Sequence, residues 1–560
     1  MNKRMVIAVV LSVALWIVYA VFFAPKQTPQ NHTAKDAKQT TSAPAPDAKK
    51  DQSAATVEAP AKGKIIPVVQ KVTKQESVLI RTKFYQVVLS NKGASIESVK
   101  YGNRSIELAG APVHGGKGLL DFGVYFSDKE LLTGNSLSDS LWSMKSLSDK
   151  SVQFETVADF SGVPVILQKT YTFNDDVAAF DISYMIKNNG KNQVVFPENR
   201  VLVSPADSLG PKLNGNSSSS YDQLYSVYYS DGSFEKGSRG GGLFSTATDM
   251  KNHTQKTNWY GIISRYFTVL MIPKENCAGV AWDSRSEGSY RIGGYMSVDP
   301  LASGSSVTRS FRVALSEKEN DVLSSVDPGI VSAMDVSKWI EPLRNGIFWC
   351  LLKINWLFGN FGVSIIILSF ITKMIFLPLT IKSTNSMKRM QLLQPEMAAL
   401  KAKYKDKPEK MQKEIMELYK KHKVNPMSGC LPLLIQMPFF IALYSALSTS
   451  VDLWQAPFCL WIKDLSSPDT LFTIGAFGGF NVNLLPILMT VTTYIQQKMS
   501  TVDTGATGAQ AMMMKIMPLL FIIFFWTMPS GLTLYWSIQN ILQIGHQVYV
   551  NKFKKTVPEE

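Results

Sequence analysis

The sequence has few of the residues that hold metal ions or staple small domains together. Among its 560 residues there are four cysteines and five histidines, all widely spaced, and no two cysteines form a Cys-x-x-Cys pair. A disulfide framework and a structural zinc site both need closely spaced ligands. We therefore expect no disulfide scaffold, no metal site and no cofactor.

Acidic residues are missing from the long apolar runs in the last 220 residues. A proton relay across a membrane needs a carboxylate or a histidine near the middle of a span. His546 is a poor candidate because it lies near the end of the last run. Internal repeats, which secondary transporters usually show, are also absent. The sequence thus disfavours proton-coupled or small-solute transport.

Positive charge is in excess, with 58 Lys and Arg against 44 Asp and Glu and a formal net charge of +14. Such a balance suggests an acidic partner: anionic lipid, a ribosome, nucleic acid or acidic polypeptide segments. The basic residues flank hydrophobic runs and are not interleaved with aromatics in a globular domain. We expect lipid bilayer contact and no direct nucleic-acid recognition.

The first 62 residues read as an anchor followed by a tether. Lys3 and Arg4 precede an apolar run of about 19 residues, close to the ~20 needed to span a bilayer. A cleaved secretory signal is the alternative, but the run is long for one and does not end at a small-x-small site. We predict a transmembrane anchor at residues 1–25. Residues 26–62 are Ala, Pro, Thr, Gln, Lys and Asp, which predicts a flexible linker.

Residues 63–328 are typical of a large all-β sandwich domain. Short β-branched and aromatic runs, such as Val165–Phe173 and Ala179–Ile186, alternate with clusters of Gly, Asn, Asp and Ser. The stretch Tyr221–Gly242, rich in Ser, Tyr and Gly, reads as a long loop. Its tyrosines permit a carbohydrate or ligand site, but we favour an ordinary surface loop.

The remaining residues predict a helical membrane region. Residues 335–358 are expected to form an amphipathic helix in the membrane interface, with a buried helix joining two domains as the alternative. The apolar runs predict five spans after the N-terminal anchor, a cytoplasmic helical hairpin and a short tail. The spans are predicted at residues 361–381, 427–448, 482–497, 516–528 and 530–550. The hairpin is predicted at residues 382–425 and the tail at residues 551–560.

The charges between the spans predict their orientation. Twelve basic residues stand against five acidic ones between Lys382 and Lys423, whereas residues 451–481 hold one lysine and three aspartates. By the positive-inside rule the first loop is cytoplasmic and the second is not. We predict six transmembrane helices with both termini in the cytoplasm, in a bacterial inner membrane, and a large periplasmic β domain.

Lys373 is the candidate functional residue, because a charge inside an apolar helix is costly. It precedes Lys382 by nine residues, roughly 13 Å along a helix. An ammonium at that depth costs at least ~2.5–3.5 kcal/mol, so it should face a protein interior or a wet cavity. Snorkelling to the cytoplasmic surface is the alternative. The polar or aromatic residues that would share a hydrated groove are Ser369, Gln436, Thr533, Trp536 and Asn540.

Methionines recur at helical spacing in the predicted cytoplasmic hairpin, among them Met387, Met390 and Met411. Methionine stripes are usually core packing. A two-helix hairpin has little core, however, and exposed methionines accommodate varied apolar partners. We predict that these residues contact substrates.

Four motifs resemble the YidC/Oxa family of membrane protein insertases, in its Gram-negative form. They are Gly362-Val-Ser-Ile-Ile-Ile, Asn425-Pro-Met-Ser-Gly-Cys-Leu-Pro, Gln455-Ala-Pro-Phe and Phe525-Trp-Thr-Met-Pro-Ser-Gly. The resemblance implies a five-helix core around a hydrophilic groove that is closed toward the periplasm. Lys373 matches the position where the family usually has arginine, and Ser369 and Trp536 match substrate-contacting positions, the second usually a tyrosine.

The resemblance implies an insertase and chaperone for nascent membrane proteins, acting alone or with the Sec translocon. Ribosomes or targeting factors are further possible partners. No bond chemistry is expected, so the protein is not predicted to be an enzyme. A Ser/Lys hydrolase is the rival reading because Ser369 lies four residues before Lys373, on the same helix face. No motif suggests its oxyanion hole.

Overall fold

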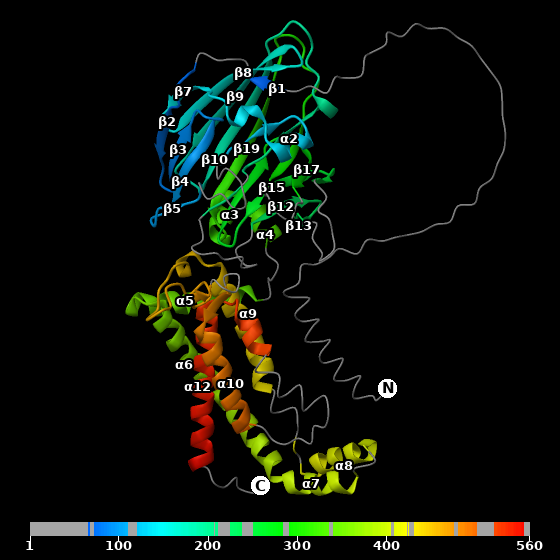
Figure 1. Cartoon of the computed structure of the whole chain (residues 1–560), viewed down its shortest axis with the longest axis vertical. Helices are drawn as coiled ribbons and strands as arrows, with labels where there is room; N and C mark the ends of the chain where they lie inside the picture. Colours follow the sequence, from blue (N-terminus) through cyan, green and yellow to red (C-terminus); the bar gives the residue numbers. More distant parts are fainter. Residues whose placement is uncertain are drawn as a thin grey trace, which may run out of the picture. The chain divides into compact units, whose positions relative to one another are not determined.

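The computed structural model describes a β domain and a set of long helices (Figure 1). The described residues are 65–67, 72–109, 120–206, 208–210, 224–237, 250–283, 291–334, 340–404, 408–422, 424, 431–474, 480–500 and 520–553. The predicted anchor at 1–25 and the linker at 26–62 lie outside these residues, as do residues 554–560 of the tail and the first part of the span at 516–528.

The β domain contains a 15-stranded and a 4-stranded antiparallel sheet. The long strands β8 (Ser151–Phe160), β9 (Val163–Phe173) and β10 (Ala179–Asn188) pair in sequence, and β10 continues to β19 (Ser306–Glu317). Every second residue of β8 is buried, as in a strand with one face toward the core. The β-rich domain is therefore confirmed.

The other strands complete the two sheets. The large sheet also holds β1 (Ile65–Pro67), β6 (Val124–Tyr125), β7 (Ser143–Ser148), β11 (Arg200–Val203), β12 (Tyr225–Ser230), β13 (Ser233–Lys236), β14 (Met250–His253), β15 (Thr257–Ile263), β16 (Phe267–Pro273), β17 (Cys277–Asp283) and β18 (Ile292–Ser297). The small sheet is β2 (Ser77–Arg81), β3 (Tyr85–Ser90), β4 (Ser95–Tyr101) and β5 (Ile106–Glu107). Helices α2 (Asp128–Thr133), α3 (Asn320–Val326) and α4 (Pro328–Met334) accompany them.

The prediction of a long loop at Tyr221–Gly242 is wrong over its middle. Strands β12 and β13 form a hairpin there, and β12 pairs with β15. Four consecutive pairs of β12–β13 meet across the turn at Asp231–Gly232, where both residues have positive φ. Serine and tyrosine are compatible with an edge hairpin, so composition alone misled the prediction.

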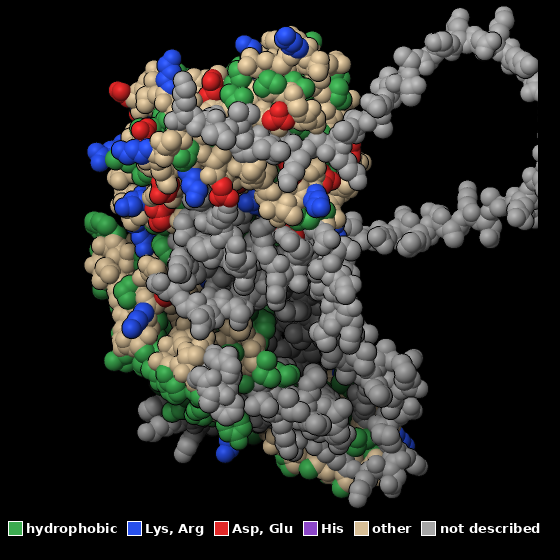
Figure 2. Space-filling view, turned by 45° about the horizontal axis from the view of Figure 1, so that its top comes forward, with side chains coloured by type: hydrophobic (Ala, Val, Ile, Leu, Met, Phe, Trp, Pro, Cys, Tyr) green, Lys and Arg blue, Asp and Glu red, His purple; other side chains and the backbone are tan. Residues whose placement is uncertain are grey.

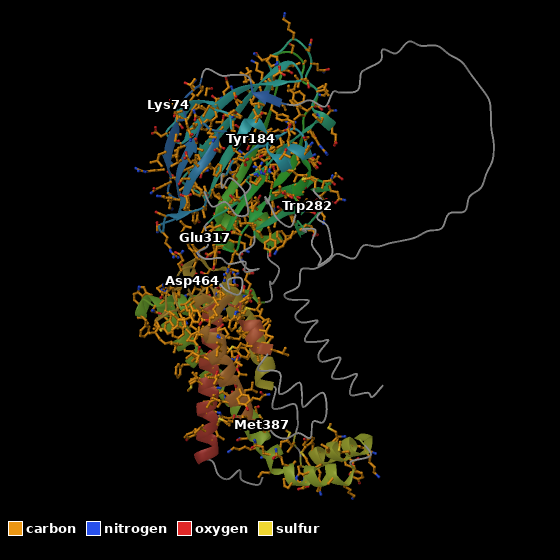
Figure 3. The ribbon with its side chains drawn as sticks, in the orientation of Figure 1. Lys74, Tyr184, Trp282, Glu317, Met387 and Asp464 are labelled. Carbon is orange, nitrogen blue, oxygen red and sulfur yellow. The ribbon has the colours of Figure 1, made fainter. Side chains whose placement is uncertain are left out.

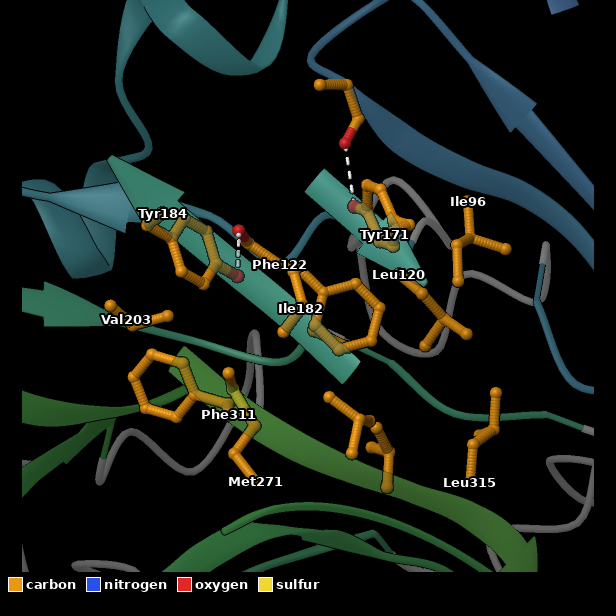
Figure 4. Packing of buried hydrophobic residues seen from close by; sticks show 14 of the residues in the cluster. Ile96, Leu120, Phe122, Tyr171, Ile182, Tyr184, Val203, Met271, Phe311 and Leu315 are labelled. Carbon is orange, nitrogen blue, oxygen red and sulfur yellow. Dashed lines mark hydrogen bonds between the residues drawn. The ribbon is translucent and has the colours of Figure 1, made fainter. Parts of the chain in front are cut away.

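Aromatic side chains fill the core of the β domain (Figure 4). Their hydroxyl groups find backbone acceptors: Tyr184 donates to the Phe122 carbonyl at 2.9 Å and Tyr171 donates to the Ala94 carbonyl at 2.7 Å. Buried polar groups need such partners because an unmade hydrogen bond costs about 1–3 kcal/mol. These bonds join β9 and β10 to the segments that cover them.

The helical core consists of α5 (Glu341–Phe358), α6 (Phe361–Leu392), α9 (Leu431–Thr449), α10 (Leu484–Ser500) and α12 (Ser530–Phe553). Helix α12 packs against both α6 and α10, and α9 packs against α5, α6 and α12 (Figure 1). Among the described residues α6 is the one helix long and apolar enough to cross a membrane. Six spans and the orientation of the termini therefore stay predictions.

Helix α5 begins at Glu341, and residues 335–339 of the predicted amphipathic helix lie outside the description. Ile347 and Leu351 are buried against the helical core, whereas Trp349, Trp356 and Leu357 are more than half exposed. A sharp turn follows, in which Gly359 has a positive φ of 64° and Asn360 caps the first turn of α6.

The surface differs between the two regions. In Figure 2, charged side chains are scattered over the β domain, while hydrophobic side chains gather over the helices. On α6 the exposed apolar residues include Phe370, Ile371, Met374 and Ile375, which flank Lys373 in sequence. Exposed apolar surface of this extent is typical of a protein whose surroundings are lipid.

The helical hairpin follows α6 without a break at residue 381. Helix α6 runs through Pro378 to Leu392, and the hairpin is then formed by α7 (Gln394–Lys403) and α8 (Pro408–Lys421). The predicted boundary between span and hairpin thus falls inside one helix. The predicted boundary followed the end of the apolar run, but the helix continues into the polar residues beyond it, and Pro378 removes one backbone hydrogen bond without ending the helix.

Candidate functional site

Lys373 lies on α6, partly exposed, and its ammonium donates a hydrogen bond to the Gln543 side-chain carbonyl on α12. Within the part of the chain that the structure describes, no acidic side chain pairs with it. The cation is therefore held by one neutral amide. An ammonium has three donors, so this arrangement leaves hydrogen-bonding capacity for another acceptor.

A seam of polar side chains continues from Lys373 along α6 and α12. The Gln539 amide donates to the Ser369 backbone carbonyl and to the Thr372 hydroxyl, both at 2.9 Å. One turn earlier on α12, the Tyr535 hydroxyl accepts from Gln436 of α9 at 3.3 Å. These contacts place α6, α9 and α12 around one polar strip inside the helical core.

A second polar seam lies on another face of α12. The Asn540 amide donates to the hydroxyls of Thr493 at 2.8 Å and Thr492 at 3.3 Å, both on α10. Near the end of the two helices the Gln547 amide donates to the Met499 carbonyl at 3.1 Å. Asn540 thus joins α10 to α12, and its side chain is turned away from the α6 seam.

The predicted groove residues do not all lie in one place. Ser369 is fully buried, and its hydroxyl donates to the Ile365 carbonyl of its own helix at 2.7 Å. Thr533 is also buried and donates to the Pro529 carbonyl at 3.3 Å. Of the predicted set, the α6 seam brings together Lys373, the Ser369 backbone and Gln436.

Trp536 lies in an aromatic cluster. Its ring centre is 5.2 Å from that of Phe440, 5.5 Å from that of Phe525 and 5.7 Å from that of Phe521. Its indole N–H is buried without a hydrogen-bond partner among the described residues. A buried N–H donor without a partner gains free energy when it binds a hydrogen-bond acceptor.

Three seam residues were missed in the sequence, namely Tyr535, Gln539 and Thr372. A signal for them existed, since Tyr535 and Gln539 precede Gln543 by eight and four residues and so share its face of α12. Thr372 comes three residues after Ser369 on α6 and meets the same strip.

A cleft of about 420 Å³ opens between α6 and α12 beyond Lys373. Leu377, one turn after Lys373, lines it together with Thr384 and Asn385 of α6 and Gly545 and His546 of α12. The glycine leaves room between the helices because it has no side chain. The cleft therefore begins one turn beyond Lys373 along α6.

The opposite end of the helical core is closed by residues 450–469, which we call the cap loop. Its Asp464 and Leu465 carbonyls accept hydrogen bonds from the start of α12, at Ser530 and Gly531. The Phe458 carbonyl accepts from Asn360, and Asp469 accepts from the Leu485 backbone N–H at 2.6 Å. The cap loop therefore ties the starts of α6, α10 and α12 together.

Phe458 of the cap loop also packs on Gly362 at the start of α6. A side chain on residue 362 would come within 2.0 Å of the Phe458 ring, so only glycine fits. Beyond the cap loop, strands β20 (Thr470–Ile474) and β21 (Phe480–Asn483) form a hairpin that leads into α10. Neither strand of this hairpin was predicted from the sequence.

The predicted hairpin contacts Met390 and Met411 pack within the hairpin itself. Met390 is buried with Leu393, Met397 and Ile415, and Met411 packs against this cluster. Met387, labelled in Figure 3, is half-buried on α6. The premise that two helices have too little core to bury these methionines is wrong. Leu392 and Met416 are the exposed apolar residues here.

Two family models match adjacent parts of the chain. Residues 77–350 match the model described as "YidC periplasmic domain", and residues 353–557 match the one described as "60Kd inner membrane protein". The boundary between them falls within α5, after the β domain and before α6.

Curated relatives match nearly the whole chain. The membrane protein insertase YidC of Pelobacter propionicus is 33% identical over 564 residues, covering 99% of each chain, and that of Leptospira interrogans is 31% identical over 99% of this chain and 98% of its own. A crystal structure of an active YidC insertase with its first transmembrane domain resolved covers 87% of this chain at 18% identity and a TM-score of 0.35. The sequence matches show that the chain belongs to the YidC family of inner-membrane protein insertases.

Proposed function

We propose that the seam around Lys373 receives the hydrophilic end of a nascent membrane protein and carries it into the inner leaflet. Moving a polar or acidic segment through hydrocarbon is costly because its groups lose their hydrogen bonds to water. Polar side chains on α6, α9 and α12 shorten the apolar distance that the segment must cross. The apolar part of the substrate then partitions into lipid beside the helices.

The observation that carries this proposal is the hydrogen bonding of Lys373. Its ammonium has a neutral partner, Gln543, in place of a carboxylate. A cation without an ion-pair partner attracts an incoming negative charge, whereas a paired one would first have to give up its partner. The cleft lined by Leu377 and His546 gives a path from the hairpin side toward this cation.

The seam does not favour hydrolysis. The Ser369 hydroxyl donates to the Ile365 carbonyl and Lys373 donates to Gln543, so the two side chains are not hydrogen-bonded to each other as nucleophile and base. We infer that the protein is an insertase without bond chemistry.

The finer features of the function belong to the same proposal. Six spans with both termini in the cytoplasm would place the Lys373 seam in the cytoplasmic half of the bilayer and the cap loop on the periplasmic side. The exposed Leu392 and Met416 of the helical hairpin offer an apolar surface for a nascent chain. The Sec translocon and ribosomes or targeting factors are proposed partners, and chaperoning of folding is a proposed second role.

Site-specific photocrosslinking tests the proposal. A photoreactive residue is placed at Gln543, at Trp536 or, as a control, at Ile541, which is half exposed on another face of α12. Ribosomes stalled on a short membrane protein with an acidic N-terminal tail supply the substrate. We expect crosslinks from Gln543 and Trp536 to exceed those from Ile541. Equal crosslinking from all three positions would contradict the proposal.

A further inference from the structure

Two arginines of the β domain contact the cap loop and its edge. Arg265, between β15 and β16, donates from Nε to the Ser448 carbonyl and from Nη2 to the Ser466 carbonyl, both at 2.6 Å. One guanidinium thus joins the end of α9 to the far end of the cap loop. The planar fork of arginine suits two acceptors at once, which a lysine cannot match.

Arg104, in the turn between β4 and β5, makes a similar pair of bonds. It donates from Nη1 to the Val451 carbonyl at 2.8 Å and from Nη2 to the Trp454 carbonyl at 2.9 Å. Its guanidinium also lies 5.8 Å from the Trp454 ring centre. Val451 and Trp454 are buried in the hydrophobic cluster of the β domain. The first part of the cap loop is therefore packed into that domain.

Acidic residues stand beside these contacts. Glu317, labelled in Figure 3, ends β19, Glu319 precedes α3, and Asp452 belongs to the cap loop. Burial, then repulsion from Glu317 and Asp452, raises the pKa of Glu319 to about 7, while Arg344 opposes the rise. Burial and Asp452 likewise raise the pKa of Glu317, and its partner Tyr101 lowers it.

Asp321 also lies near Glu319, and Lys236, Arg265 and Arg344 lie near the neighbouring Lys318. These groups include both signs. The bonds described above from Arg104 and Arg265 are made to backbone carbonyls.

We propose that Arg104 and Arg265 form a latch between the β domain and the cap loop, and that ionisation of Glu317 and Glu319 beside Asp452 loosens it. The latch acts on the helical core, because the cap loop holds the starts of α6, α10 and α12. Arg104 and Arg265 are thus positioning residues for the closed end of the core. This inference is independent of the role proposed for Lys373.

The sign of the pH effect follows from where the protons bind. In the latched state Glu319 holds its proton up to a pH of about 7, whereas a glutamate in water releases it near pH 4.3. Between these values the latched state binds more protons, so latching is favoured by acid and weakens as pH rises toward 7. Above a pH of about 7 Glu319 is ionised in both states, so the free-energy cost of latching no longer changes with pH.

Hydrogen–deuterium exchange of the full-length protein in nanodiscs tests the latch. Peptides covering residues 448–466 are compared between the wild type, the variant Arg104→Ala/Arg265→Ala and the control Arg312→Ala. Arg312 is a matched arginine that pairs with Asp181 within the β domain. Exchange of the cap-loop amides should rise by about tenfold or more in the double variant, since bonds from charged donors are lost, and stay unchanged in the control.

Peptides from β9 and β10 report whether the β domain remains folded in the double variant. If they lose protection, Arg104→Lys/Arg265→Lys replaces it, because lysine keeps the charge and loses the two-pronged contact. Unchanged cap-loop protection in a variant whose β9 and β10 stay protected would overturn the latch.

The pH dependence of cap-loop exchange tests the role of Glu317 and Glu319. In the wild type, cap-loop protection corrected for intrinsic exchange should fall as the pH rises from about 5 to about 8. In Glu317→Gln/Glu319→Gln this dependence should be lost, with protection close to that of the wild type in acid. A fall of the same size in both proteins would overturn the role of these two carboxylates.

Discussion

Two lysines are at least partly buried, one in the β domain and one in the helical core, and their ammonium groups differ in how many hydrogen-bond partners they have. Lys169 on β9 is 2% exposed, and its ammonium donates to the backbone carbonyls of Gly93, Ala94 and Asp121 at 2.9–3.2 Å. Lys373 on α6 is partly exposed and has the Gln543 side chain as its described hydrogen-bond partner. The first has a partner for each of its three donors, and the second does not.

The comparison separates a structural cation from one available to a partner. Burial lowers the pKa of Lys169 to about 7, with the Asp121 carboxylate opposing, so the carbonyls offset only part of the cost of removing its charge from water. Its role is to join β9 to the segments around Gly93 and Asp121. Lys373 joins α6 to α12 through one hydrogen bond to a side chain, and its remaining N–H donors are available to a further acceptor.

Reversing the charge of Lys373 should have the largest effect. Lys373→Glu turns attraction for an acidic tail into repulsion, and each is worth between about 1 and 4 kcal/mol at 4 Å. We expect insertion of an acidic-tailed substrate to fall about 100-fold, measured by protease protection in proteoliposomes. Lys373→Arg should retain most activity. Equal loss in both variants would show that geometry, and not charge, matters at this position.

Replacing Lys169 by methionine should instead cost stability. Lys169→Met keeps the volume but leaves the Gly93 and Asp121 carbonyls without this donor, at about 1–3 kcal/mol for the lost bonds. Thermal unfolding of the purified protein at about pH 9, where Lys169 of the folded state is largely neutral, should move to lower temperature when followed by tryptophan fluorescence. Lys145→Met, at an exposed lysine of β7, is the control. If Lys373→Met destabilises as much as Lys169→Met, the distinction between the two lysines fails.

The pH dependence of stability sharpens the same contrast. The folded chain releases the Lys169 proton near pH 7, whereas an unfolded lysine holds it to about pH 10.4. Between these values the unfolded state binds more protons, so the free energy of unfolding rises with pH. The difference between wild type and Lys169→Met should grow by about 1 kcal/mol per pH unit from pH 7 to 9. A constant difference would contradict the lowered pKa.

The smallest effect is expected at the second polar seam. Asn540→Leu removes the bonds to Thr492 and Thr493, and bonds of this kind between membrane helices are worth about 0.6 kcal/mol. Unfolding in mild detergent should shift slightly, with insertion nearly unchanged. A loss of insertion as large as that of Lys373→Glu would mean that this seam, too, contacts the substrate.

Much of the fold follows from local patterns. β-Branched and aromatic runs predicted β9 and β10, whose buried faces repeat every two residues. Apolar runs predicted α9, α10 and α12 within a few residues, and the start but not the end of α6. The β12–β13 and β20–β21 hairpins escaped because their residues do not alternate clearly between polar and apolar. Such strands are defined by their pairing partners, which a single segment does not reveal.

The sequence predicted Lys373 as the central residue of the site, but it did not predict which side chains contact it. Lys373 stands out in the sequence because few charges lie inside apolar helices. The last helix carries several polar residues, and nothing in the sequence selects Gln543 among them as the partner of Lys373. Which face of α12 meets α6 depends on how the helices rotate and cross, and that is decided by packing along their whole length. Ser369 was placed correctly on the helix, but its burial was not foreseen.

The cap loop, Lys373 and the hairpin core are all carried by α6. The helix starts at the Asn360 cap beside Phe458, passes Lys373 and ends two residues after Met390 enters the hairpin core. Its 32 residues span about 48 Å, more than the ~30 Å of hydrocarbon. One continuous helix therefore carries both Lys373 and the start of the hairpin core, with Pro378, which has no backbone N–H to donate, between them. We expect a displacement of the hairpin to be transmitted to Lys373 along this helix.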